Sequence, residues 1–140
     1  MFRTAIHELV HIQQFSHGSR IESAYTGDTL YIAILREGIA EYIARQLYPY
    51  GNDGNYWSYG IQQEPQLREK LKPELYSTSL NDWIYHPVAD GSRPNDIGYF
   101  MGARIAEAYH KSLSQYPTDY TPLIENTNLR RLLDSNEYFR

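Results

Sequence analysis

Residues 2–15 read Phe2-Arg3-Thr4-Ala5-Ile6-His7-Glu8-Leu9-Val10-His11-Ile12-Gln13-Gln14-Phe15, and this stretch decides the fold and the chemistry expected of the chain. His7 and His11 are four residues apart, so on a helix they lie one turn apart on the same face and both imidazoles can reach one metal ion. Glu8 directly follows His7, close enough to take a proton from a metal-bound water without binding the metal itself. The remaining positions are almost all apolar. We therefore expect a buried helix whose polar residues form one site.

The pattern His-x-x-x-His with an intervening Glu also arises by chance, and the alternative is a pair of core histidines satisfied by ordinary hydrogen bonds. Chance matches usually lie on a polar surface or across a turn. Here the pattern lies in an apolar helix, where two histidines and a glutamate are costly to bury without partners or a metal. The arrangement His-Glu-x-x-His is that of zinc metallopeptidases, so we favour zinc binding by His7 and His11.

Length and composition limit the remaining choices. The chain has 140 residues, long enough for a real core, and we expect a single domain over residues 1–140. A net charge of −4 and the lack of a basic cluster argue against a nucleic-acid partner. Without cysteine, a zinc site must be built from His, Asp or Glu. No apolar run approaches membrane-spanning length and no signal peptide is visible, so we expect no transmembrane segment.

A second helix is expected over residues 30–47, where Glu37 and Glu41 share a stripe while the opposite side is also apolar. Two acids in such a helix need an explanation, because burying a charge without a partner is costly. One explanation is a metal ligand together with a carboxylate that orients a ligand histidine. The other is that these acids pair with a base such as Arg36 or Arg45, or reach solvent.

The two motifs together resemble the gluzincin metallopeptidases. They are His7-Glu8-Leu9-Val10-His11 and, after 25 residues, Glu37-Gly38-Ile39-Ala40-Glu41. In that group, a glutamate on the next helix is the third zinc ligand. The resemblance implies that His7, His11 and Glu37 bind Zn²⁺ and that Glu8 is the general base. It also implies that Glu41 hydrogen-bonds one of the ligand imidazoles.

Two later stretches resemble a narrower group, the uncharacterised bacterial families of predicted zinc-dependent proteases that include relatives of a gliding-motility lipoprotein. These stretches are Asp82-Trp83-Ile84-Tyr85 and Arg93-Pro94-Asn95-Asp96-Ile97-Gly98-Tyr99-Phe100-Met101-Gly102. The similarity covers most of the chain but lacks the region upstream of the metal helix, where zinc peptidases carry a sheet whose edge strand pairs with the substrate. We therefore expect a mainly α, zincin-like helical domain that is the C-terminal part of a metallopeptidase fold, in a fragment of a longer chain. By resemblance alone, its location would be the bacterial cell envelope or the exterior.

A metzincin-like site is the rival within the zinc peptidases, because His17 stands where that group has its third histidine. Gln14, however, occupies the position of the glycine that lets the metzincin helix stop and the chain turn back. That site would also leave Glu37 unused. We prefer Glu37 to His17 as the third ligand.

The rest of the chain is expected to be helices joined by long ordered loops. A connection covers residues 50–60, and a helix opens at Glu64-Pro65 with Leu67, Leu71 and Leu75 facing inward until Pro73 interrupts it. Trp83 and Tyr85 are expected to anchor a turn-rich loop in which His86 lies at the surface. Two short helices after Pro117 are expected to close the bundle, with Tyr138 and Phe139 docked on it.

A further long helix is expected from residue 95 or 96 to residue 114. Gly98 and Gly102 in it suggest the close approach of another backbone, for which the metal helix is one candidate. Tyr99 and Arg104 are candidates for stabilising a developing oxyanion, with Tyr99 preferred and His110 a weaker choice. The alternative for Tyr99 is a tyrosine that packs and forms a hydrogen bond.

Two functions of different classes follow. The preferred one is a zinc-dependent peptidase acting on a peptide or protein, in which Glu8 and Tyr99 would be the catalytic side chains. The other is a non-catalytic envelope or interaction module that kept a zincin scaffold, with or without bound zinc. A missing upstream strand would leave the fragment inactive towards a generic peptide, and nothing in the sequence specifies an oligomeric state.

Overall fold

The computed structural model describes residues 1–16, 29–113, 118–126 and 128–140, and these residues form helices joined by loops without any strand. The longer helices are α1 (Phe2–Ser16), α3 (Leu30–Leu47), α4 (Gly54–Leu71) and α5 (Ile97–Leu113). The shorter helices are η1 (Lys72–Glu74), which lies between α4 and α5, and three that come after α5: α6 (Thr121–Ile124), α7 (Leu129–Asp134) and η2 (Glu137–Phe139). The expectation of a mainly α domain is confirmed.

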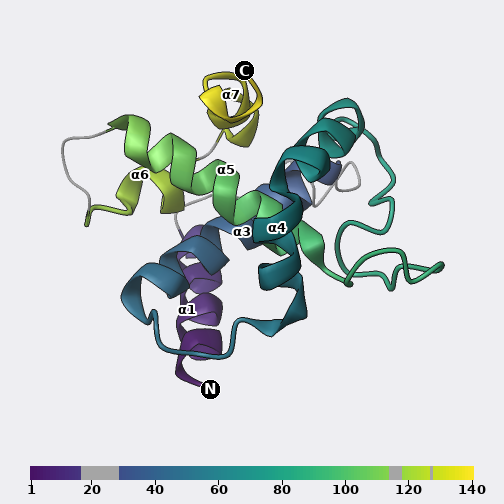
Figure 1. Ribbon diagram of the computed structural model, residues 1–140. Coiled ribbons are helices and arrows are strands. Elements are labelled where there is room, and N and C mark those ends of the chain that lie inside the picture. Colours follow the sequence, from purple (N-terminus) through teal and green to yellow (C-terminus); the bar gives the residue numbers. More distant parts are fainter. Residues whose placement is uncertain (17–28, 114–117, 127) are drawn as a thin grey trace.

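Helix α3 lies at the centre, where α5 crosses it and α1 packs along it (Figure 1). Its residues from Leu30 to Ala44 are buried on every side except at Arg36. This burial explains why α3 is apolar around nearly its whole circumference, as is typical of a helix with neighbours on all faces. The two acids of the helix, Glu37 and Glu41, are themselves buried and face α1.

The crossing of α3 and α5 depends on a pair of glycines. A Cβ atom added at Gly38 would overlap the backbone of Gly102, and one added at Gly102 would overlap the carbonyl of Ile34. A Cβ at Gly98 would lie 2.7 Å from the carbonyl oxygen of Trp83. The expected close backbone approach is therefore present, but the neighbours are α3 and the loop before α5, and not α1.

Helix α1 is less buried than its apolar sequence suggested. Its buried residues are His7, Val10 and Gln14, one narrow stripe at helical spacing. The exposed apolar side chains of α1, each between 56% and 68% accessible, are Phe2, Leu9, Ile12 and Phe15. The prediction of a buried helix was wrong, because α1 lies at the edge of the described fold and packs mainly against α3.

Helix α4 begins earlier than expected, at Gly54, so that Pro65 lies inside it. Its first turns are held by aromatic packing, since the Trp57 ring lies 5.0 Å from Phe100 and the guanidinium of Arg45 lies 3.3 Å from the centre of the same indole. These contacts favour a helix where the local Gly- and Asn-rich composition indicated a loop. Pro65 removes one backbone hydrogen bond from the helix. The surrounding packing offsets that loss.

Other expectations for the connecting segments are confirmed. Leu67, Leu71 and Leu75 face inward, and α4 gives way at Leu71 to the 3₁₀ turn that contains Pro73. In the C-terminal part, α6 and α7 are the two short helices that were expected. The Tyr138 side chain is buried and its hydroxyl donates a hydrogen bond of 2.8 Å to Glu64.

The loop over residues 81–96 is ordered by its buried members. Trp83 and Ile84 are fully buried, and the indole N–H of Trp83 donates to Glu74 at 2.9 Å. His86 is exposed, as predicted. The loop also contains all the non-glycine residues of the described chain that have a positive φ, namely Asn81, Asp82, Tyr85 and Asp96.

Candidate metal centre

Helices α1 and α3 bring three side chains from the predicted ligand set together. The Nε2 atoms of His7 and His11 are 3.0 Å apart, and Oε2 of Glu37 lies 3.1 Å from the first and 3.0 Å from the second. All three side chains are nearly enclosed, with 11–14% of their surface accessible. These atoms form a group that could hold a metal ion. Ligands of a tetrahedral zinc ion lie about 3.3 Å apart, a few tenths of an ångström more than is seen here.

The outer nitrogens of both imidazoles face hydrogen-bond acceptors. Nδ1 of His11 lies 2.8 Å from Oε1 of Gln14, whose amide nitrogen donates to the Arg36 carbonyl at 3.3 Å. Nδ1 of His7 lies 3.4 Å from Oε2 of Glu41. With the Nδ1 atoms as donors, the neutral imidazoles direct their Nε2 lone pairs at one another and at a carboxylate oxygen. Three lone pairs at this separation repel unless a cation lies among them, so this donor set fits a metal.

Glu41 divides its two oxygens between two partners. Oε2 faces His7, whereas Oε1 accepts hydrogen bonds from Arg45 Nε at 2.6 Å and from the Tyr56 hydroxyl at 3.0 Å. Burial opposes ionisation of this carboxyl, but the hydrogen bond with His7 and the charge of Arg45 outweigh it and lower the pKa of Glu41 to about 2. Glu41 therefore contacts both kinds of partner that the sequence suggested for it, a histidine of α1 and a nearby base.

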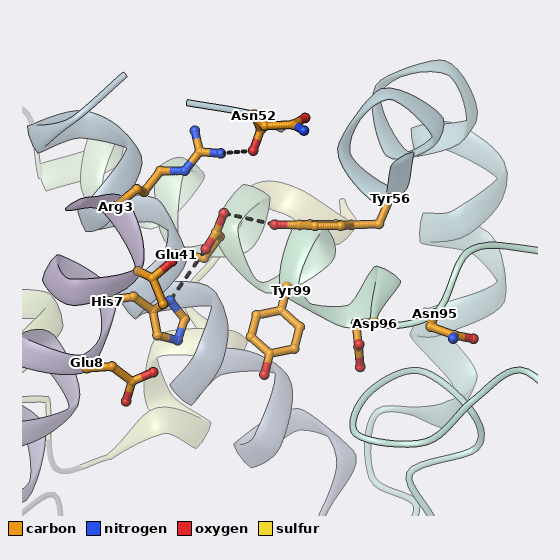
Figure 2. Close-up of a pocket in the computed structure, with 10 residues that line it drawn as sticks. Arg3, His7, Glu8, Glu41, Asn52, Tyr56, Asn95, Asp96 and Tyr99 are labelled. Atoms are coloured by element: carbon orange, nitrogen blue, oxygen red, sulfur yellow. Dashed lines mark hydrogen bonds and ion pairs between the residues drawn. The ribbon is translucent and has the colours of Figure 1, made fainter. Parts of the chain in front are cut away.

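The same network ties the start of α1 to the connection between α3 and α4. Arg45 Nη1 lies 2.6 Å from Asp53 Oδ1, and Arg3 Nη1 lies 2.9 Å from the same oxygen. Arg3 also donates to the backbone carbonyl of Asn52 (Figure 2). Helix α1 is thus held by ion pairs one turn before His7.

Glu37 also uses both of its oxygens. Oε2 faces the histidines, and Oε1 accepts a short hydrogen bond from the Tyr85 hydroxyl. Sequence reasoning placed Tyr85 only as a loop anchor and missed its contact with the site, because no local pattern links residues 48 positions apart. Gln14 was also missed, although its position three residues after His11 on the same helix was an available signal.

Protonation at the centre follows from these contacts. Burial disfavours the charged imidazole, but the hydrogen bonds and charges of Glu37 and Glu41 outweigh it and raise the pKa of His7 to about 9. Burial likewise opposes ionisation of Glu37, yet the hydrogen bonds from His11, His7 and Tyr85 hold the pKa of this carboxyl well below its usual range. In the metal-free protein, a proton on His7 therefore takes the place that a metal cation would fill.

A cavity of about 390 Å³ opens beside His7. Glu8 and Tyr99 both line it, and Figure 2 shows them on either side of the His7 ring. The ring centres of His7 and Tyr99 are 5.9 Å apart. Burial and the negative charge of Glu37 raise the pKa of the Tyr99 hydroxyl, which therefore remains a hydrogen-bond donor at neutral pH. The two predicted catalytic side chains thus share one cavity with a predicted metal ligand.

Two other candidates, Arg104 and His110, do not line this cavity. Arg104 instead pairs with Glu64 at 3.0 Å and with Glu107, so its suggested role at the oxyanion is not supported by its position. His110 is buried between the Tyr42 hydroxyl, at 3.0 Å, and a backbone carbonyl at 2.8 Å. His17, the alternative third ligand, lies outside the described residues. Helix α1 continues through Gln14 to Ser16. This agrees with the expectation that a helix without glycine at position 14 would not stop there to form a metzincin-like turn.

Comparisons with models of protein families, with curated proteins and with solved structures found no match. The case for a function therefore rests on the geometry of the site. In the part of the chain that the structure describes, every helix is too short or too polar to cross a membrane.

Proposed function

We propose that this chain is a zinc-dependent peptidase of gluzincin type, with zinc held by His7, His11 and Glu37. One observation carries the proposal: two imidazole nitrogens and a carboxylate oxygen lie 3.0–3.1 Å apart while the outer nitrogen of each imidazole faces an acceptor. Two imidazoles and a carboxylate are a ligand set typical of catalytic zinc. Three protein ligands leave a coordination position open, whereas structural zinc sites usually have four. The zincin-like nature of the domain over residues 1–140 is part of this proposal.

Zinc in this site would lower the pKa of a water molecule and polarise the scissile carbonyl. A carboxylate oxygen of Glu8 would accept the proton of the attacking water and pass it to the amide nitrogen as the C–N bond breaks. The products are a carboxylate and an amine. The Tyr99 hydroxyl would donate a hydrogen bond to the carbonyl oxygen as its negative charge develops. Glu41 and Gln14 would keep the rings of His7 and His11 in the required orientation.

A second candidate is a non-catalytic interaction module on the same scaffold. The observation that favours it is the exposed apolar side of α1, where Leu9, Ile12 and Phe15 are each more than half accessible next to the ligand histidines. Exposed apolar patches often mark sites of protein association. In this reading, zinc would stabilise the module without hydrolysis. A place in the cell envelope or outside the cell, which the resemblance implies, belongs to the proposal in either case.

The test combines metal content with hydrolysis. Zinc per chain is measured by elemental analysis on wild type, Glu37→Gln and Glu8→Gln, and hydrolysis of a peptide library is followed by mass spectrometry with the same proteins. We expect about one zinc in wild type and Glu8→Gln, and loss of zinc in Glu37→Gln. Of these three proteins, only the wild type is expected to hydrolyse peptides. A fourth protein, Tyr99→Phe, is expected to remain active with kcat lowered by about 10²-fold, as when an oxyanion donor is removed.

The outcomes separate the two candidates. Equal hydrolysis by wild type and Glu8→Gln would exclude the peptidase mechanism, because the base would then be dispensable. Zinc bound by a wild-type protein that cleaves no peptide in the library would favour the interaction module. A folded wild-type protein that takes up no zinc would contradict the metal site itself.

A further inference from the structure

The second oxygen of Glu37 points away from the histidines and towards the loop over residues 81–96. Oε1 accepts a hydrogen bond from the Tyr85 hydroxyl, whereas Oε2 lies 3.0–3.1 Å from the two Nε2 atoms. The carboxylate is therefore held in one orientation from two sides. Only one of its oxygens is directed at the place where a metal would bind.

The Tyr85 hydroxyl is itself oriented by Arg36. Nη2 of Arg36 donates to the hydroxyl oxygen at 3.0 Å, so that the hydroxyl hydrogen is left for Glu37. A hydroxyl that accepts from a cation becomes a better donor, because hydrogen bonds in a chain polarise one another.

The backbone of the loop fixes where this hydroxyl lies. Trp83 and Ile84, the two residues before Tyr85, are fully buried. The N–H of Tyr85 donates to Oδ1 of Asp96 at 3.0 Å. Tyr85 has a φ of 66°, which is unfavourable for a residue with a bulky side chain. Such conformations persist where surrounding contacts hold them, and they cluster at functional sites.

We infer that Tyr85 is a positioning residue of the metal site. By keeping Oε1 of Glu37 engaged, it leaves Oε2 as the single oxygen available to the metal. Glu37 then binds through one oxygen, and a coordination position remains open for water or substrate. This inference rests on the metal-binding part of the proposed function, and it does not depend on peptide hydrolysis.

The test uses cobalt in place of zinc, because the visible absorption of Co²⁺ is strong in four-coordinate sites and weakens as the coordination number rises. The variant is Tyr85→Phe, which removes one oxygen from a side chain that is 41% exposed. The matched control is Tyr76→Phe, since the Tyr76 hydroxyl also donates to a carboxylate, Oδ1 of Asp134 at 3.0 Å, and no predicted metal ligand is involved. Zinc affinity is measured in parallel by competition with a chromogenic chelator.

We expect wild type and Tyr76→Phe to share an intense cobalt spectrum. In Tyr85→Phe, Oε1 of Glu37 loses the hydrogen bond from the Tyr85 hydroxyl and keeps the longer ion pair with Nε of Arg36 at 3.9 Å. It is then expected to bind the metal as well, so the absorption falls. Zinc binding in this variant is expected to weaken by about 10- to 100-fold, the usual effect of removing a group that supports a metal ligand. Circular dichroism of the metal-free proteins should show the same helix content in all three.

An unchanged cobalt spectrum in Tyr85→Phe would overturn the inference, whatever happens to the affinity. A weak spectrum in the wild type, typical of five or six ligands, would also overturn it, and this holds even if the variant does not fold. A wild-type protein that binds neither metal would overturn the inference and the proposed function together. Intense cobalt absorption without any peptide hydrolysis would remove the peptidase proposal and leave the inference standing.

Discussion

Each ligand side chain at the candidate metal centre has two polar atoms and gives one of them to the centre and one to a support. His7 is supported by Glu41, and His11 by Gln14. Glu37 is supported by Tyr85. Because the supports are hydrogen-bonded in turn, they fix the orientation of the two imidazole rings and of the carboxylate.

The raised pKa of His7 predicts how the stability of the metal-free protein depends on pH. The pKa is about 9 in the folded state and about 6.5 when unfolded. The folded state therefore binds the proton more tightly, and the resulting stability is fully present below pH 6.5 and is lost as the pH rises through 9. We expect the Tm measured in EDTA to fall between pH 6.5 and pH 9.

The control for this measurement is His7→Gln, which should show a flatter Tm over the same pH range. With excess zinc, the wild-type decline should also be reduced, since the metal replaces the proton. A wild-type Tm in EDTA that stays constant from pH 6.5 to pH 9 would show that His7 is not held between the two carboxylates.

At the level of residues, the sequence predicted what helical spacing determines. That His7 and His11 share one face of a helix follows from their separation of four residues. That Glu37 and Glu41 share another follows from their place on one stripe of an apolar helix. Tyr85 could not be assigned in this way, because it reaches Glu37 through a loop whose path is set by the burial of Trp83. Whether the Glu8 and Tyr99 side chains are catalytic remains a prediction.

At the level of elements, the helices differ in how many neighbours they pack against. This number decides how much of each apolar pattern is buried. Helix α3 is enclosed and α1 is not, although both are rich in apolar residues. Local sequence predicted that both helices form, but it could not show how many sides each would bury. For the same reason it missed the start of α4, which depends on packing of Trp57 against α5.

The crossing of α3 and α5 predicts a large effect of a single methyl group. Gly38→Ala would place a Cβ atom inside the backbone of Gly102, which cannot move aside as a side chain could. We expect the free energy of unfolding to fall by at least about 2 kcal/mol, towards the upper end of the usual cost of overpacking. Chemical denaturation of the metal-free protein measures this loss.

The matched control is Gly51→Ala, where the nearest atom, 3.1 Å from the new methyl, belongs to the flexible end of the Arg3 side chain. This variant should unfold within about 0.5 kcal/mol of the wild type, as is usual for surface changes. Similar stabilities for the two variants would mean that α3 and α5 are not in backbone contact.

At the scale of the whole molecule, the candidate site joins α1, a helix with few buried side chains, to the core. Two of its ligands, His7 and His11, come from α1, and the third comes from α3. Helix α1 buries few side chains, and two of the buried ones are His7 and Gln14, which are polar. A metal bound here would therefore supply a large part of what holds α1 in place.

Zinc removal is expected to act on α1 first. At a free zinc concentration of about 100 times Kd, binding should stabilise the folded state by about 2.7 kcal/mol. In EDTA, hydrogen exchange followed by mass spectrometry should accelerate in the peptide that contains α1, while the central parts of α3 and α5 stay protected. Glu37→Gln should show the faster exchange with or without zinc. Equal exchange of α1 in zinc and in EDTA would contradict this role of the metal.

Gly38, which follows Glu37 in the Glu-Gly pair of the motif, has a role in packing. It is required because α5 passes directly over it, so that an added Cβ atom would meet the backbone of Gly102 and Ala103. A relative that had lost its ligands but kept the same helix crossing would still need this glycine. A relative with a wider crossing could replace it and keep the three candidate metal ligands. Conservation of the Glu-Gly pair would then report on the architecture of the family, and only the glutamate would report on its chemistry.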